Sequence, residues 1–183
     1  MRKILVGIFG HDRPGIIAAV SGVLFEHGCN IEDVSQTILQ SEFCGTFIAT
    51  IPRDRHLEEL LESLRQALDP MGLSVLLRLM EDTGVWDSPP SEPFVITTLG
   101  PDRLGLVAGI TGLLADYGIN ITNLKAVFRG GENPTHNTMI YEVDIPNGID
   151  QNRFREALYK KGEELGIEIS VQHRKIFEAI HRI

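Results

Sequence analysis

Two short turns carry the side chains whose types and spacing best suit the binding of an anion. The first reads GHDRPG over residues 10–15, and the second reads GPDRLG over residues 100–105. An apolar helical pattern follows each turn, and the free amides at a helix N-terminus attract an anion such as a carboxylate. Arg13 adds a guanidinium that cannot lose its charge. The same residues also explain a well-capped helix start, with Pro14 at the first helical position and Asp12 as the capping carboxylate.

An asparagine follows each of these helical patterns at the same spacing. GCNI spans residues 28–31 and GINI spans residues 118–121, where the predicted helix ends and the next strand begins. Because asparagine tolerates turn conformations, helix exit alone explains its presence. We also expect this strand to lie near the first strand and its turn, where the amide would offer a donor and an acceptor to a polar ligand. The residues favour these two interpretations equally.

The matching turns belong to a duplicated segment. Residues 10–34 align with residues 100–124, and 10 of the 25 positions are identical, where ordinary residue frequencies would give roughly one or two. The second copy has four more residues before the match resumes, and the loop RGGENPTHN over residues 129–137 is the place for them. Each copy is long enough to bury its own core. The identical positions of the first copy are Gly10, Asp12, Arg13, Gly15, Ala18, Gly22, Leu24, Gly28, Asn30 and Ile31.

Hydrophobic periodicity gives both copies the same element order, strand–helix–strand–strand–helix–strand. With right-handed crossovers this order predicts an α+β fold of two tandem ferredoxin-like βαββαβ domains, each a four-stranded antiparallel sheet with two helices on one face. In the first copy we expect strands at 4–9, 30–39, 44–51 and 73–79, and helices at 16–27 and 57–68. In the second copy we expect strands at 94–99, 120–128, 139–145 and 167–171, and helices at 106–114 and 154–165.

The predicted domains are joined and followed by short segments. We expect a first domain over residues 1–81, a linker over 82–92, a second domain over 93–175 and an amphipathic tail over 176–183. The linker is rich in proline and serine, which indicates a semi-rigid connection. Its Trp86 is expected to pack on a neighbouring domain, because burial of an indole is favourable. The tail is too short for a stable isolated helix, so we expect it to dock on the neighbouring domain or a second subunit.

The two motifs together resemble an ACT domain. The first copy carries the resemblance through Gly10, Asp12, Arg13, Pro14, Gly15 and Ile16, and then through Gly28, Cys29, Asn30, Ile31, Glu32 and Asp33. The second copy carries it through Gly100, Asp102, Arg103, Gly105, Gly118, Asn120 and Ile121. A tandem pair of this length is similar to the glycine cleavage system transcriptional repressor family. Formyltetrahydrofolate deformylases begin with a similar segment but continue into a catalytic domain, which this sequence lacks.

The resemblance implies a regulatory module that binds small ligands, usually amino acids, at domain interfaces. It implies that amides near Gly15 or Gly105 meet the ligand carboxylate, that an asparagine bridges its polar groups and that an aspartate attracts its ammonium. The second copy has Leu104 in place of Pro14, so the two sites are expected to differ. The implied ligand-binding residues are Asp12, Arg13, Pro14, Gly15, Asn30 and Ile31 in the first copy, and Asp102, Arg103, Gly105, Asn120 and Ile121 in the second.

Composition and motif content exclude several classes of function. The chain has 183 residues and a net charge of −8, which does not suit direct binding to nucleic acid, because such binding needs clustered cations. No apolar run approaches the roughly 18 residues of a membrane span, and the N-terminus does not read as a signal peptide. The two cysteines predict reduced thiols in a cytoplasmic protein. We find no phosphate loop, nucleophile elbow or paired metal-ligand spacing, and we expect neither metal nor cofactor. His27 is expected to end a helix, and His11 is a candidate ligand contact.

The sequence therefore favours a non-catalytic regulatory protein that senses a small ligand, with an amino acid as the expected ligand. We expect a homodimer that acts through a regulator protein partner, in transcriptional regulation of amino-acid metabolism, and glycine is the first candidate ligand because of the resemblance. One alternative is a structural interaction module that binds no ligand. Another is the regulatory subunit of an enzyme of amino-acid or one-carbon metabolism.

Overall fold

The computed structural model describes residues 1–80, 89–127 and 137–180. The chain divides into two compact units, Met1–Val85 and Trp86–Ile183. Each unit has its own four-stranded sheet and its own hydrophobic core. The expectation for Trp86, most of the loop over 129–137 and the last three residues of the tail lie outside the described residues.

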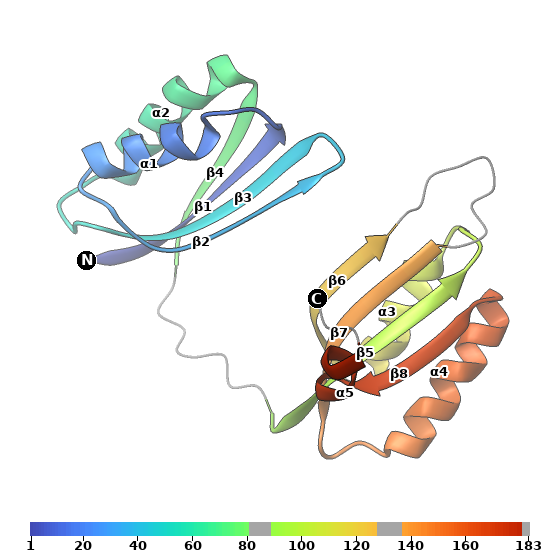
Figure 1. Ribbon diagram of the computed structural model, residues 1–183. Coiled ribbons are helices and arrows are strands. Elements are labelled where there is room, and N and C mark those ends of the chain that lie inside the picture. The colour runs from blue at the N-terminus through green and yellow to red at the C-terminus, as the bar shows by residue number, and fades with distance from the viewer. Residues whose placement is uncertain (81–88, 128–136, 181–183) are drawn as a thin grey trace. The chain divides into compact units, whose positions relative to one another are not determined.

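The first domain follows the predicted order βαββαβ (Figure 1). Its strands pair antiparallel in the order β2-β3-β1-β4, and both helices cover one face of the sheet. A short 3-10 turn, Asp69–Met71, interrupts the chain after α2, where Pro70 cannot continue a helix. The elements are β1 (Arg2–His11), α1 (Ile16–Glu26), β2 (Asn30–Leu39), β3 (Glu42–Ile51), α2 (Leu57–Leu68) and β4 (Leu73–Leu79).

The second domain repeats this arrangement with the strand order β6-β7-β5-β8. The structure therefore confirms the predicted fold class in both copies. It adds a short helix, α5, after the last strand. The elements are β5 (Ser91–Gly100), α3 (Leu106–Asp116), β6 (Asn120–Val127), β7 (Asn137–Pro146), α4 (Gln151–Leu165), β8 (Glu168–His173) and α5 (Arg174–Ile180).

The alternation of side chains along the strands decides which face of each sheet is buried. In β1, Ile4, Val6 and Ile8 are fully buried under the helices, whereas Leu5 and Phe9 lie on the other face. In β3 the burial likewise alternates at every residue from Phe43 to Ile51. The period of two is the pattern of a sheet with one buried face, and the helices supply their apolar stripes to that face.

Helix α5 covers part of the opposite face of the second sheet. It contacts β5 and β8 of its own domain, and it lies on the side away from α3 and α4 (Figure 1). Val95 points to this side and is only 2% exposed. Arg174, at the start of α5, forms an ion pair with Glu142 at 3.2 Å and donates a hydrogen bond to Thr122 at 3.3 Å. A helix of this length holds its shape through such tertiary contacts.

The start of α1 differs from the expectation. Pro14 does not occupy the first helical position, because the helix begins at Ile16 and Pro14 lies in the preceding turn. Gly15 forms the N-cap with φ of 99°, in the left-handed region that glycine adopts without strain. Gly105 repeats this conformation before α3 with φ of 90°. The left-handed conformation of Gly15 therefore ends the turn before the helix. A helix that began at Pro14 would not need a glycine at this position.

Candidate ligand-binding site

The turn between β1 and α1 is held at one end of the first sheet. Its Asp12 donates a backbone hydrogen bond to the Ser41 carbonyl at 2.8 Å, so the turn is attached to the tip of the β2–β3 hairpin. In the described part of the chain, no side chain caps the first amides of α1. This corrects the expectation that the Asp12 carboxylate caps the helix. The amides of the first helical turn are therefore free to bind another acceptor.

A cleft of about 220 Å³ opens beside these free amides. It brings together three of the predicted residues, Asp12, Arg13 and Gly15, with the start of α1. Gln36 of β2 and Phe43 of β3 complete the lining, and the sequence analysis missed both. Phe43 could have been found as the first inward position of its strand, whereas Gln36 carries no signal of its own. The remaining lining residues are Ile16, Ile17 and Ala18.

Among the described residues, the charged groups of this cleft have no other partners. Asp12 and Arg13 are both exposed. Within the described parts of the chain, the Arg13 guanidinium has no hydrogen-bond or ion-pair partner. An unpaired guanidinium beside free helix amides gives the cleft a positive potential that favours an anion. The Asp12 carboxylate on the same turn provides an acceptor for a cationic group.

The corresponding turn of the second domain is engaged by its own domain. Arg103 donates from Nη1 to the carbonyl of Leu165 at 3.5 Å, at the C-terminal end of α4. A methyl group on Gly166 would lie 3.0 Å from that nitrogen, so the guanidinium rests directly on the end of the helix. The Asp102 carboxylate accepts a hydrogen bond from Nδ2 of Asn137 at 3.3 Å. These contacts satisfy both charged groups of the turn inside the domain.

The strands β3 and β7 also differ, at the position that lies beside each turn. Asn137 occupies the position in β7 that Phe43 occupies in β3, since each pairs with the glycine that precedes the turn. Asn137 is 92% buried, and its Oδ1 has no partner among the described residues. Leu104, which replaces Pro14, is fully exposed. The two turns therefore share a backbone conformation but differ in the described side-chain contacts of their aspartate and arginine.

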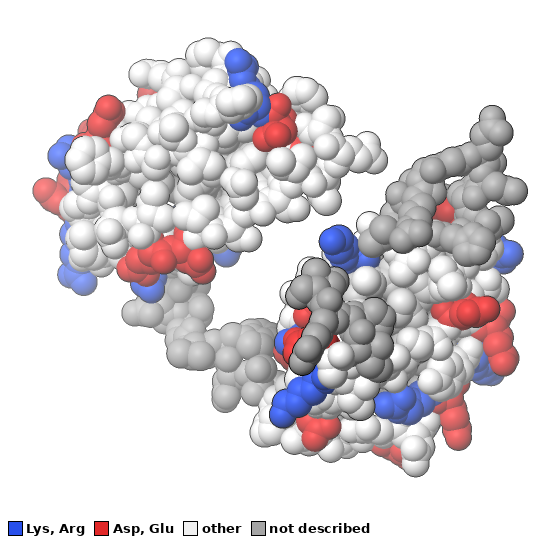
Figure 2. Space-filling view, in the orientation of Figure 1, with Lys and Arg blue, Asp and Glu red and all other residues white. Residues whose placement is uncertain are grey.

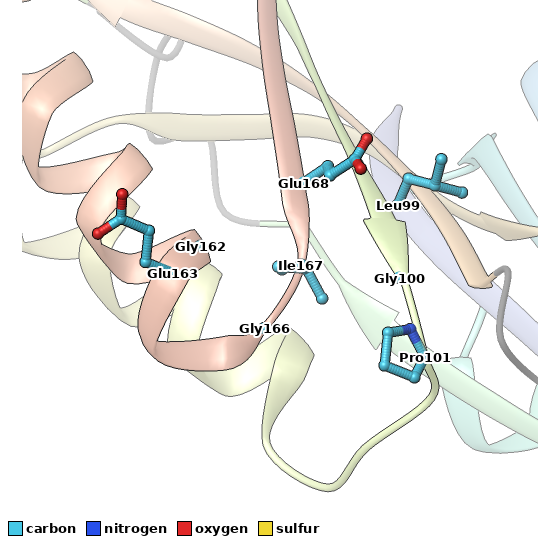
Figure 3. A pocket seen from close by; sticks show the side chains of 8 residues that line it. All are labelled: Leu99, Gly100, Pro101, Gly162, Glu163, Gly166, Ile167 and Glu168. Carbon is cyan, nitrogen blue, oxygen red and sulfur yellow. The ribbon is translucent and has the colours of Figure 1, made fainter.

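A second cleft, of about 410 Å³, is lined by Gly100 and Pro101 of the second turn together with residues near the end of α4 and the start of β8 (Figure 3). It separates the end of β5 from the end of α4, and glycine backbone forms much of its wall. The carboxylates of Glu163 and Glu168 come from α4 and β8 and point in different directions. They do not converge on one point, so the cleft presents no assembled cation site. Its lining residues are Leu99, Gly100, Pro101, Gly162, Glu163, Gly166, Ile167 and Glu168.

The asparagine of each copy does not join the turn of the same copy. Asn30 pairs with Thr50, which pairs with Lys3 at the start of β1, whereas the turn follows His11 at the end of β1. Eight residues of strand at about 3.3 Å each place them roughly 26 Å apart. Asn120 is placed likewise, beside Asp144 and far from Gly100. The expected proximity was wrong. Helix α1 carries the chain back to the end of the sheet at which β1 begins, and β2 starts there, whereas the turn lies at the opposite end.

The isoleucines that follow these asparagines contribute to the cores. Ile31 packs against the core of the first domain, and Ile121 packs against the core of the second. A β-bulge follows each of them and re-aims the strand. In the first domain the bulge residue Glu32 forms an ion pair with Lys3 at 2.8 Å. The starts of β2 and β6 therefore have a structural role in their domains, and each carries an exposed asparagine side chain.

The histidines and cysteines have local roles. His11 lies opposite Glu42 at 3.5 Å, at the rim of the turn. His27 is the C-cap residue of α1, as predicted, and its Nε2 lies 2.9 Å from the Ser63 hydroxyl. Burial raises the pKa of the Cys29 thiol above its usual range, although nearby Arg55 opposes the shift. Over the described ranges, no group of three metal-ligating side chains converges.

The distribution of surface charge concerns nucleic-acid binding, and the length of the helices concerns membrane crossing. On the face that Figure 2 shows, lysine and arginine side chains lie scattered among carboxylates, unlike the clustered cations of a phosphate-binding surface. Among the helices in the described part of the chain, none has the length and apolar character that a membrane crossing requires.

Comparison with known proteins matches both domains to one family model. The model described as ACT domain covers residues 2–77 and 92–172. A UPF0237 protein of Methanosarcina acetivorans is 37% identical over 94 residues, which is 51% of this chain and 98% of that protein. A UPF0237 protein of Lactococcus lactis is 37% identical over 89 residues, which is 49% of this chain and 97% of that protein. Each of these relatives corresponds to about half of the present chain.

Solved structures share the tandem arrangement. An unknown protein from Galdieria sulphuraria matches with a TM-score of 0.74 and 24% identity, over 94% of this chain and 98% of that one. A candidate glycine cleavage system transcriptional repressor matches with a TM-score of 0.67 and 19% identity, over 93% of this chain and 96% of that one. At these identities the likeness establishes the fold of the whole chain and leaves the ligand to be argued from the site.

Proposed function

Because this chain belongs to the ACT domain family, we propose that it is a non-catalytic regulatory protein that senses a small amino acid. One observation carries the proposal: the cleft before α1 combines uncapped helix amides with the Arg13 guanidinium, which has no partner among the described residues. Modules of this family regulate by binding small ligands, usually amino acids. The cleft supplies both charges that an amino acid needs.

The chemistry of binding follows from the elements around the cleft. The ligand carboxylate accepts hydrogen bonds from the first amides of α1 and from Arg13. The ligand ammonium donates to the Asp12 carboxylate. Pockets for drug-sized ligands measure about 300–1,000 Å³, so a cleft of about 220 Å³ suits a small amino acid. Phe43 forms an apolar wall, which favours a ligand with a small or absent side chain.

Asn30 and Asn120 enter the proposal in a different way from the turns. Asn30 lies roughly 26 Å from the turn of its own copy, and Asn120 lies nearly as far from its turn. Neither side chain can touch a ligand that the turn of its own copy holds. We assign the asparagines a role only in a site assembled from two molecules, where the strand start of one meets the turn of the other. Ile31 and Ile121 then act by fixing the backbone on which the asparagines stand.

The regulated process is proposed from the fold and the charge. Glycine is the first ligand to test, because a structural neighbour is named as a candidate glycine cleavage system repressor. The net charge of −8 favours action on transcription through a protein partner over direct contact with DNA. The engagement of Asp102 and Arg103 within the second domain supports a second candidate function, in which the chain is an interaction module or an enzyme's regulatory subunit.

Calorimetric titration of the full chain with each of the twenty amino acids at millimolar concentration tests this proposal. We expect heat with glycine or another small amino acid, and at least a tenfold loss of affinity in Arg13→Ala, because a charge-assisted hydrogen bond contributes about 1.5–3 kcal/mol. Arg103→Ala is the matched control and should leave the affinity unchanged. Asn30→Ala and Asn120→Ala should weaken binding only if two molecules build the site.

The outcomes separate the candidate functions. Loss of binding in Arg103→Ala with normal binding in Arg13→Ala would place the working site in the second domain and contradict the assignment made here. No heat with any amino acid would reject ligand sensing and favour the interaction module. Copurification with a catalytic subunit would favour the enzyme-subunit alternative.

A further inference from the structure

One face of the first sheet carries no described helix of its own domain and is mainly apolar at its centre. Both described helices of the first domain lie on the other side of this sheet (Figure 1). The uncovered side includes Phe9, which is 45% exposed, and Leu76, which is 50% exposed, together with the half-buried Leu5 and Ile48. The Phe9 ring lies against the backbone at Gly7, 3.1 Å from where a β-carbon would stand. We refer to this side as the open face.

The corresponding face of the second domain is covered from within the chain. Val95, which lies in the second sheet where Leu5 lies in the first, is 2% exposed because α5 packs over β5 and β8. The neighbouring position in β7 is Glu142, which holds Arg174 of α5, whereas β3 has Ile48 there. Thus the first domain presents an apolar side chain where the second presents an anchor for its own helix.

Residues of the open face form straight rows across the four strands. One row runs Asp33–Ile48–Leu5–Arg78, from β2 to β4. The next runs Ser35–Thr46–Gly7–Leu76, and the third runs Thr37–Cys44–Phe9–Ser74. The first row therefore carries a negative charge at one edge of the sheet and a positive charge at the other. Asp33 and Arg78 are exposed and have no partner among the described residues.

We propose that the open face is the interface through which two copies of this chain form a symmetric dimer. A two-fold axis along the strands turns one sheet over and exchanges its edges, so each row meets its own reverse. The start of β2 therefore does not reach the partner's turn in this dimer, and a ligand site built from those two segments would need a second contact between molecules. Asp33 then faces Arg78 of the partner at both ends of the first row, and Ile48 faces Leu5 between them. In the third row, Cys44 faces Phe9. An axis across the strands would leave the edges unexchanged, and Asp33 would not come opposite Arg78 of the partner.

The geometry of stacked sheets accommodates this pairing. Sheets that pack face to face lie about 10 Å apart with strands inclined by about 30°. A long arginine side chain spans the sideways displacement that this angle introduces at the edge of the sheet. Four strands at about 4.8 Å and eight residues at about 3.3 Å give a footprint of roughly 500 Å² per copy. Both copies together reach about 1,000 Å², the low end for a specific interface, so we expect a dissociation constant in the micromolar range.

Sedimentation velocity of the full chain, without added amino acid, over about 1 to 500 µM tests the proposal. We expect a concentration-dependent dimer. Asp33→Arg and Arg78→Asp should each raise the dissociation constant about tenfold or more, because each turns two attractive pairs into repulsive ones. The double variant should return to within about threefold of the unaltered chain. A mixture of the two single variants should associate more tightly than either one alone.

Control variants and contrary outcomes keep the test decisive. Phe25→Asp alters an aromatic side chain on α1 that is 81% exposed, and it should leave association unchanged, whereas Phe9→Asp should abolish it. Far-UV circular dichroism of every variant checks folding. A chain that stays monomeric throughout, a dimer that ignores both charge changes, or a double variant that fails to recover would each overturn the proposal. A monomer with slow amide exchange along β1 and β4 would place another segment on this face and would also overturn it.

Discussion

The stability of the turn before α1 should require a residue at position 15 that adopts a left-handed backbone conformation without strain. The space around this position should not matter. A β-carbon placed there meets no atom within 4 Å, but the residue has φ of 99°. Gly15→Ala therefore introduces no clash, and its cost is the strain of an L-residue in the left-handed region, about 1–2 kcal/mol. Gly22, in the middle of the same helix, also has open space around it. Gly22→Ala should instead stabilise the domain by about 0.5–1 kcal/mol, since alanine is the better helix former.

The same substitution should thus act with opposite sign at two positions of one chain. With a slope of roughly 1 kcal/mol per molar urea for a small domain, Gly15→Ala should lower the midpoint of unfolding by about 1–2 M. Gly22→Ala should raise it by about 0.5–1 M. Urea unfolding followed by hydrogen exchange of β1 reports on the first domain alone. Equal effects at the two positions would refute the argument, as would stabilisation by Gly15→Ala. Gly105→Ala and Gly112→Ala offer the same contrast in the second domain.

Three further predictions concern the cores, the tail helix and a partly buried thiol. Leu24→Ala should destabilise the first domain by about 2–5 kcal/mol and speed amide exchange within residues 1–80 only, because the two cores are separate. Arg174→Ala should speed exchange in α5 and cost about 0.5–1 kcal/mol through loss of the Glu142 ion pair, which lies about two-thirds buried. Alkylation of Cys29, measured by mass spectrometry, should be slower in the folded than in the unfolded chain at neutral pH, because burial raises its pKa. The protonated folded form is favoured, so its contribution to stability is complete below the unfolded pKa and is lost as pH rises through the folded one.

Local signals in the sequence predicted much of the fold. The alternation of apolar residues identified β4 with the observed bounds, and the leucine spacing did so for α2. These elements follow from side-chain period alone, which is a property of neighbouring residues. The duplication extended the same prediction to the second domain. The prediction that α1 begins at Pro14 was wrong because the capping conformation depends on the φ angle of Gly15. The residue types of the turn are compatible with a helix that begins at either position.

The sequence predicted only part of the candidate site. The sequence singled out Asp12, Arg13 and Gly15, and the structure brings them to one cleft. The expectation that Asn30 lies near the turn was wrong although the predicted fold already made β1 and β2 parallel, which puts the end of β1 and the start of β2 at opposite ends of the sheet. Nothing in the sequence indicated that Arg103 reaches the end of α4.

The sequence by itself determined the elements, the duplication and the residue types of both turns, because these depend on composition and on spacing along the chain. The tertiary structure decided which charges are free and which are engaged, because that depends on contacts between residues far apart in the chain. Arg13 and Arg103 stand in matching motifs, yet one faces a cleft and the other rests on a helix end. The open face of the first sheet is likewise a property of strand register, which brings Asp33 and Arg78 into one row from opposite edges.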